Sequence, residues 1–177
     1  MLSVVTSILN GLLQPHEPLQ YFGYEILYSS STSAWKDALR KSVGAPVGTT
    51  EELIYRALST SFERPDTQFG ILVGLGTDED YSNNNNNSAS SSEEEEEEEG
   101  YYTVEFPFDP LDYFDGTAWL ECRLRDTQSD KLLVVLGWSL QQRESDGAWL
   151  IEGIDWQDFR DKYRPGYGRE EWERICG

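Results

Sequence analysis

The sequence predicts an α+β domain in which N-terminal helices pack on a curved antiparallel sheet formed by the C-terminal half. Three observations predict this fold class. Apolar residues recur at helical spacing at the start of the chain, strand-like runs separated by turn residues fill residues 117–155, and the length of 177 residues fits one domain. We therefore expect residues 1–177 to form a single domain, interrupted by a low-complexity insert at residues 82–99.

The start of the chain predicts an amphipathic helix. Its apolar stripe ends before Pro15 and Pro18, which cannot continue a helix. No basic segment or small-residue cleavage site accompanies the stripe, so we expect a helix of the domain; a plastid transit peptide would have to lie upstream of Met1. The stripe consists of Leu2, Val5, Ile8, Leu9, Leu12 and Leu13.

Three further helical segments are expected before residue 60. Residues 21–33 predict a short helix that passes into a Ser/Thr-rich loop, and residues 35–43 predict another turn or two. Thr49 and Glu52 have the spacing of a capping box, in which each side chain satisfies a backbone donor of the first turn. They predict a helix that extends to about Ser59.

The middle of the chain predicts two strands separated by the insert. Residues 69–76 form an apolar run bounded by glycine, and residues 101–108 form a second run that ends before Pro110. Five consecutive asparagines, a serine patch and seven consecutive glutamates in residues 82–99 cannot bury apolar area. We expect this insert to be a disordered loop between the two strands.

Residues 117–126, 131–143 and 148–155 predict a meander of three strands, with Asp146 and Gly147 in the last turn. Apolar and mixed residues alternate in the first strand, which predicts one apolar face. The register between the strands stays open, and a slip of one residue would exchange the two faces. The apolar positions of the first strand are Ala118, Leu120, Cys122 and Leu124.

The C-terminal segment predicts helices. Asp155 is placed to cap a helix from Trp156 to about Tyr163, and residues 168–175 predict one more.

Charge excludes one class of partner. The formal net charge is −19, and outside residues 78–99 the chain still has 23 acidic and 14 basic residues, a net charge of −9. A phosphate backbone would be repelled, so we expect no nucleic-acid partner. We also expect no membrane partner, because the apolar segments are too short and too interrupted to span a bilayer.

Residues that carry cofactor or metal chemistry are sparse. His16 is the only histidine, and Cys122 and Cys176 form neither a disulfide framework nor a metal-ligand cluster. We expect no cofactor and no metal. We also expect a buried structural thiol at Cys122 and a soluble intracellular protein in a reducing compartment.

The closing hairpin, Asp146-Gly147-Ala148-Trp149-Leu150-Ile151-Glu152-Gly153, resembles the nuclear-transport-factor-2-like (SnoaL-like) superfamily with its cone fold, related to the cystatin-like folds. The segment from Glu17-Pro18 to Tyr28-Ser29-Ser30, together with Gly137-Trp138-Ser139-Leu140, resembles a family of uncharacterised bacterial and plastid-lineage proteins within it. The resemblance implies a pocket between helices and sheet and often a dimer through the sheet. It transfers no catalytic residue.

Aromatic residues are the candidates for lining such a pocket. For each of them, however, a place in an ordinary hydrophobic core is expected more often than a place in the wall of an open cavity. The candidates are Tyr24, Tyr28, Tyr102, Trp119, Trp138 and Trp149.

An isomerase or dehydratase would need a carboxylate base in an apolar pocket and a hydroxyl donor. Glu105, Glu121 and Asp155 are the strand-borne candidates for the base, with Tyr28 or Tyr102 as the donor. The structural alternatives are a mixed sheet face for Glu121 and a helix cap for Asp155.

Our leading hypothesis is a non-catalytic binding domain that takes a small apolar molecule in its pocket or a protein partner across its sheet. The alternative is a small-molecule isomerase or dehydratase. A homodimer through the sheet is compatible with both, and Leu133 and Val135 on the outer face would favour it.

Overall fold

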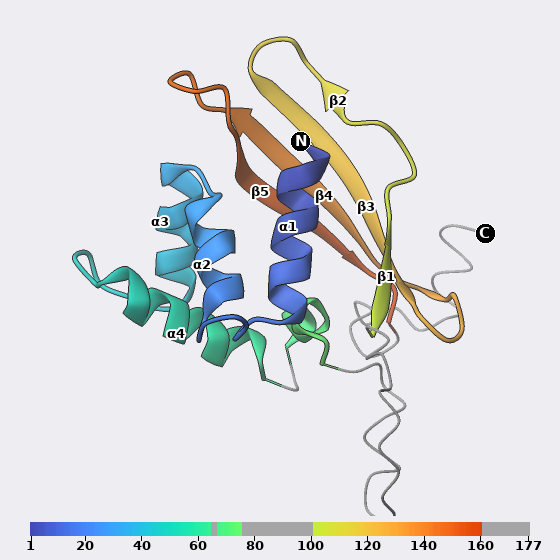
Figure 1. Ribbon diagram of the computed structural model, residues 1–177, viewed down its shortest axis with the longest axis horizontal. Coiled ribbons are helices and arrows are strands. Elements are labelled where there is room, and N and C mark those ends of the chain that lie inside the picture. The colour runs from blue at the N-terminus through green and yellow to red at the C-terminus, as the bar shows by residue number, and fades with distance from the viewer. Residues whose placement is uncertain (65–66, 76–100, 161–177) are drawn as a thin grey trace, which may run out of the picture.

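The computed structural model describes residues 1–64, 67–75 and 101–160. Helices occupy the first part and strands the last part, which confirms the α+β fold class (Figure 1). The elements are α1 (Leu2–Leu13), α2 (Phe22–Ser29), α3 (Ser33–Ser42), α4 (Glu51–Phe62), the 3-10 helix η1 (Gln68–Val73), β1 (Tyr102–Glu105), β2 (Leu111–Asp112), β3 (Thr117–Asp126), β4 (Leu132–Gln142) and β5 (Trp149–Asp158).

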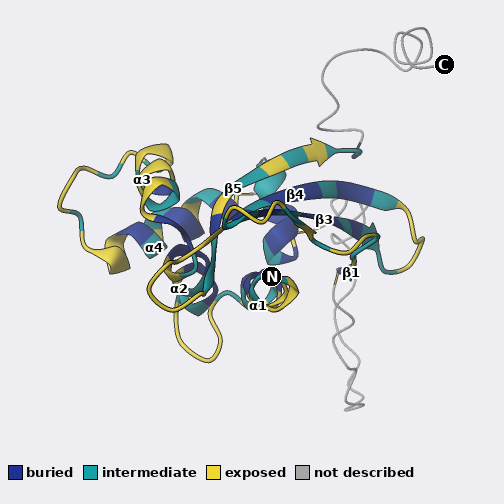
Figure 2. Ribbon diagram, turned by 90° about the horizontal axis from the view of Figure 1, so that it is seen from above, coloured by how far each residue is buried: buried dark blue, intermediate teal, exposed yellow. Residues whose placement is uncertain are grey.

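The strands form one antiparallel sheet in the order β1-β3-β4-β5, and the short β2 also pairs with β3. The register shifts between Leu124 and Arg125 and again between Ser139 and Leu140. Such bulges bend a strand and increase its twist, which accounts for the curvature. Figure 2 shows α1 and α2 against one face of this curved sheet.

The register decides which side chains face the helices. Leu120 lies opposite Trp138 and Cys122 opposite Leu136, and all four side chains belong to the buried core. The alternation expected in the first strand of the meander is confirmed. We call the other side of the sheet, which carries Trp119 among others, the outward face.

Helix α1 contributes the apolar stripe expected from the sequence. Val5, Ile8, Leu9 and Leu12 are fully buried in the same core as the inner face of the sheet. Helices α1 and α2 meet closely, because a Cβ atom at Gly23 would overlap with the carbonyl group of Gly11 in α1. Any larger residue at position 23 would therefore force these two helices apart.

Two details of the predicted helices are wrong. The capping box does not form: α4 begins after Thr50, and the Thr49 hydroxyl donates 2.8 Å to the Pro46 carbonyl instead. Helix α4 also continues past Ser59 to Phe62, because Phe62 packs into the core.

The strand predicted at residues 69–76 is also wrong within the described residues, which form η1. The Thr67 hydroxyl accepts a hydrogen bond from the Phe69 N–H, and Gly74 ends the helix with φ 73°. Short apolar runs do not distinguish a strand from a buried helical turn. The insert therefore follows a 3-10 helix rather than a strand; residues 82–99 themselves lie outside the described residues.

The prediction of a helix from Trp156 is wrong for residues 156–158, which belong to β5. Asp155 caps nothing: it lies inside β5, opposite Gly137, and the strand continues to Asp158 opposite Val134. Pairing with β4 outweighs the local cap signal, since tertiary contacts override propensity. The rest of that helix beyond residue 160 and the helix predicted at residues 168–175 lie outside the described residues.

Candidate functional site

Four of the aromatic pocket candidates lie in the core between helices and sheet. Tyr24 and Trp138 are fully buried, and Tyr28 and Tyr102 are nearly so. Their polar groups have partners there: the Trp138 indole donates 3.1 Å to Cys122 Sγ, and the Tyr102 hydroxyl donates 3.2 Å to the Leu72 carbonyl.

The other two candidates lie elsewhere. Trp119 belongs to the outward face, where its indole ring rests against Gly137 of β4. Trp149 begins β5 and is half-buried. The structure therefore does not bring the six aromatic residues to one place.

The three candidate carboxylates share the outward face. Glu105 lies opposite Arg123, while Glu121 and Asp155 both lie opposite Gly137 from the two neighbouring strands. The candidate donors Tyr28 and Tyr102 are buried in the core on the other side of the sheet.

Two of these carboxylates form ion pairs along the sheet. Arg125 Nε lies 2.8 Å from Glu105 Oε2, and Arg123 Nε lies 2.9 Å from Glu121 Oε1. The hydrogen bond from Arg125 holds the pKa of Glu105 below its usual value. Both carboxylates are thus paired with a guanidinium, whereas a general base of raised pKa needs an apolar surrounding without such a partner.

Apolar side chains gather beside these ion pairs, at the β2 edge of the outward face. The Arg123 guanidinium lies over the Phe108 ring at 6.0 Å, and Leu111 of β2 lies opposite Trp119. Phe108 and Leu111 expose 63% and 52% of their surface. We call Phe108, Leu111, Tyr113, Phe114 and Trp119 the aromatic edge.

Phe114 is the most exposed member of the aromatic edge. Its exposed fraction is 93%, and its φ of 62° is in the left-handed region, which costs a residue with a Cβ roughly 1–2 kcal/mol. Flanking aspartates hold this turn: Asp112 accepts from the Phe114 N–H at 2.8 Å, and Asp115 accepts from the Thr117 N–H at 2.9 Å. The domain therefore maintains a strained, fully exposed phenylalanine without any gain from burial.

A polar cluster at the end of α4 is centred on Glu63, a residue that the sequence did not single out. Glu63 Oε1 accepts hydrogen bonds from the Tyr24 hydroxyl at 2.8 Å and the Ser59 hydroxyl at 2.9 Å. It also lies 3.0 Å from His16 Nε2. The Tyr21 N–H donates to His16 Nδ1 at 3.2 Å, so the proton of the neutral ring is on Nε2.

This cluster joins the α1–α2 loop to α4 and leaves no histidine nitrogen free to act as a base. Burial and the Glu63 carboxylate raise the pKa of Tyr24 above its usual value, so its hydroxyl stays protonated. His16 and Glu63 are 47 positions apart in the sequence. No local sequence pattern therefore predicts that their side chains meet.

Two classes of feature are not found in the part of the chain that the structure describes. Within residues 1–64, 67–75 and 101–160 no group of three His, Cys, Asp or Glu side chains is arranged to hold a metal ion. No helix in the same residues has the length and apolar character needed to cross a membrane.

Comparisons of the chain with protein families, with curated proteins and with solved structures found no match.

Proposed function

We propose that this protein is a non-catalytic binding domain that works by protein–protein contact through the outward face and the aromatic edge. The observation that carries the proposal is Phe114, which is 93% exposed in a left-handed turn. A residue with a Cβ atom keeps a left-handed backbone conformation only where the surrounding structure imposes it. Such residues are concentrated at functional sites. Exposed aromatic side chains are common anchors in the pockets of protein partners.

The composition of the surface supports a protein partner. Interfaces are enriched in aromatic residues and arginine, and the rim around their apolar centre is polar. Here the Arg123 guanidinium lies over the Phe108 ring, and its charge is balanced by Glu121. Exposed apolar side chains that cluster, rather than lie singly, mark interaction sites.

A second copy of this chain is the partner that we propose for this surface. Two chains with a net charge of −19 repel each other over most of their surface. On the outward face, Arg123 and Arg125 offset Glu121 and Glu105 and leave the charge of Asp155, so the repulsion between two copies is reduced there. Val135 lies opposite Arg123 and thus belongs to this face, whereas Leu133 is buried at the register shift of β4 and does not.

The placement of the carboxylates favours binding over catalysis. Glu105, Glu121 and Asp155 lie on the face away from Tyr28 and Tyr102, so they do not form the carboxylate and hydroxyl pair of an isomerase or dehydratase. A small apolar ligand between helices and sheet would have to displace Trp138, which is fully buried. Both ideas rank below the protein partner.

We also propose that this chain is related to the nuclear-transport-factor-2-like superfamily. Helices that precede a curved antiparallel sheet, with one sheet face left free of described helices, support it (Figure 2). So does the closing β4–β5 hairpin with Asp146 and Gly147 in its turn. We further propose a reducing, intracellular location, supported by the free buried thiol of Cys122.

Sedimentation equilibrium of the full chain tests the proposal. We expect the mass to rise from 20.3 kDa towards twice that value with increasing concentration. Phe114→Gly should shift the dissociation constant upward by about tenfold, the range of one anchor side chain. The same substitution should leave the thermal midpoint unchanged or raise it, because glycine relieves the left-handed turn.

Val47→Ser is the matched control, since Val47 is 88% exposed in the α3–α4 loop, away from the outward face. It should leave the dissociation constant unchanged. A chain that stays monomeric at millimolar concentration, or one whose association is weakened equally by Val47→Ser, would show that the second copy is not the partner.

A further inference from the structure

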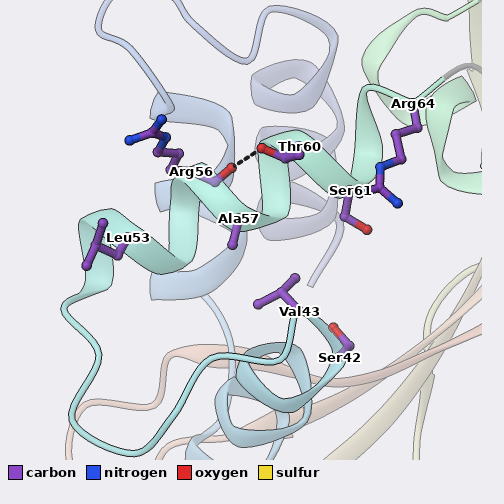
Figure 3. A pocket seen from close by; sticks show the side chains of 8 residues that line it. All are labelled: Ser42, Val43, Leu53, Arg56, Ala57, Thr60, Ser61 and Arg64. Carbon is purple, nitrogen blue, oxygen red and sulfur yellow. Dashed lines mark hydrogen bonds between the residues drawn. The ribbon is translucent and has the colours of Figure 1, made fainter.

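A surface groove runs between the end of α3 and the face of α4 that turns towards it. Its volume is about 520 Å³, within the range of small-molecule sites. Figure 3 shows Ala57 and Ser61 pointing from α4 towards Val43 and Ser42, with Leu53 towards one end and Arg64 at the other. The groove lies on the helical side of the molecule and is separate from the outward face.

The two ends of the groove differ chemically. Leu53, Ala57 and Val43 give one end an apolar lining, and Leu53 exposes 53% of its surface. Ser61 and Arg64 make the other end polar and basic. An occupant that matches both ends has an apolar body and a single anionic head.

The guanidinium of Arg64 is unusual in this acidic chain. Among the described residues, only Arg56 and Arg64 of the arginines form no ion pair with a carboxylate, and both line this groove. Glu63, the neighbour of Arg64, is already bound by Tyr24 and Ser59. The paired arginines are Arg40, Arg123, Arg125, Arg143 and Arg160.

The hydroxyl groups of the groove are not equivalent. Ser42 donates 2.7 Å to the Leu39 carbonyl, and Thr60 donates 2.9 Å to the Arg56 carbonyl. Within residues 1–64, 67–75 and 101–160, the Ser61 hydroxyl has no such partner. Among the hydroxyl groups of the groove, the unused donor is therefore that of Ser61, at the Arg64 end, while the guanidinium of Arg56 lies near Leu53 at the other end (Figure 3).

We propose that this groove binds an amphipathic organic anion. Arg64 and Ser61 bind its carboxylate or phosphate head by charge-assisted and neutral hydrogen bonds. The apolar body lies over Ala57, Val43 and Leu53. Arg56, which extends from the groove near Leu53 (Figure 3), adds long-range attraction at the rim.

An NMR titration of the ¹⁵N-labelled full chain tests this site, with octanoate, octyl phosphate and octanol as probes. Both anions should shift the amide signals of α4 and of the end of α3, and octanol should bind at least about tenfold more weakly. The comparison of octanoate with octyl phosphate decides which head group the site prefers. Arg64→Gln should weaken the binding of both anions by about tenfold, because it removes one charge-assisted contact.

Arg143→Gln is the matched control, because Arg143 is paired with Asp146 in the β4–β5 turn, and it should leave binding unchanged. Ala57→Leu keeps every charge but fills the apolar end, and it should also weaken octanoate binding. The proposal is overturned if octanol binds as tightly as octanoate, or if Arg64→Gln and Arg143→Gln have equal effects. It is also overturned if Ala57→Leu leaves octanoate binding unchanged in a folded protein.

Discussion

Trp119 lies across Gly137 on the outward face of the sheet. A Cβ atom at Gly137 would be 2.9 Å from Nε1 of Trp119 and 3.2 Å from two further ring atoms. The glycine therefore makes room for the indole to lie flat along β4, at the edge of the surface that we propose for binding. The backbone of Gly137 does not require glycine, because its φ is not in the left-handed region.

Gly137→Ala should move this ring. We expect a loss of about 1 kcal/mol in the free energy of unfolding, because an added methyl group overpacks the contact, together with a change in tryptophan fluorescence. Gly153→Ala is the control in the same sheet, since a Cβ atom there would meet nothing within 4 Å. Equal effects of the two substitutions in urea titrations would argue against the Trp119 contact.

Cys122 should be unreactive in the folded protein. Burial raises the pKa of its thiol to about 12, and the thiol is fully shielded from solvent. In a Cys176→Ser background, we expect no reaction with a disulfide reagent at pH 8 until denaturant is added. A rapid reaction without denaturant would contradict the buried position.

The same pKa predicts how stability depends on pH. The folded state holds the thiol proton more tightly than the unfolded chain, in which a cysteine has a pKa of about 8.5. The contribution of Cys122 is therefore complete below that value and is lost as the pH rises towards about 12. Cys122→Ala should remove this part of the alkaline loss, which thermal melts between pH 8 and pH 10.5 can measure.

Glu63 should stabilise the domain mainly through Tyr24. Glu63→Ala removes the 2.8 Å acceptor of a hydroxyl on a fully buried residue, which costs about 1–3 kcal/mol when a buried donor is left unpaired. In a Tyr24→Phe background that donor is absent, so the same substitution should cost less. Urea denaturation of the four proteins of this cycle measures the difference, and additive effects would show that the two side chains do not interact.

Asp158 and Arg160 form a buried ion pair at the end of β5. Their side chains are each 5% exposed and lie 2.7 Å apart, and Arg160 also donates to the Gln68 carbonyl at the start of η1. Asp158→Asn removes the carboxylate charge that lies 2.7 Å from this buried guanidinium, so we expect a loss of about 3 kcal/mol in the free energy of unfolding.

Asp146→Asn is the matched control for this pair. The ion pair between Asp146 and Arg143 is solvent-exposed, and ion pairs of that kind contribute little. The Arg143 guanidinium lowers the pKa of Asp146 to about 2, so this pair stays ionised at neutral pH. If Asp146→Asn were as damaging as Asp158→Asn, burial would not be the cause.

Local sequence patterns predicted much of the fold. The stripe on α1 and the alternation of β3 were predictable because each depends on residues only a few positions apart. The same alternation predicted a buried thiol at Cys122 and an outward side chain at Arg123. The turn at Asp146 and Gly147 was predictable for a similar reason, since the glycine supplies the positive φ of 72°.

Local sequence patterns gave wrong predictions where contacts with residues far away in the sequence decide the secondary structure. Asp155 has the local character of a helix cap, but pairing with β4 keeps it in a strand. The apolar run at η1 fits a strand equally well, and its packing against α1 and α4 decides for a 3-10 helix.

By itself, then, the sequence determined the fold class, the succession of N-terminal helices and a C-terminal meander, and the small number of residues suited to metal or nucleophile chemistry. Only the tertiary structure decided that Glu105, Glu121 and Asp155 share the outward face and that His16 meets Glu63. The physical reason is that register, curvature and helix docking are set by contacts between residues far apart in the chain, whose partners no local pattern identifies.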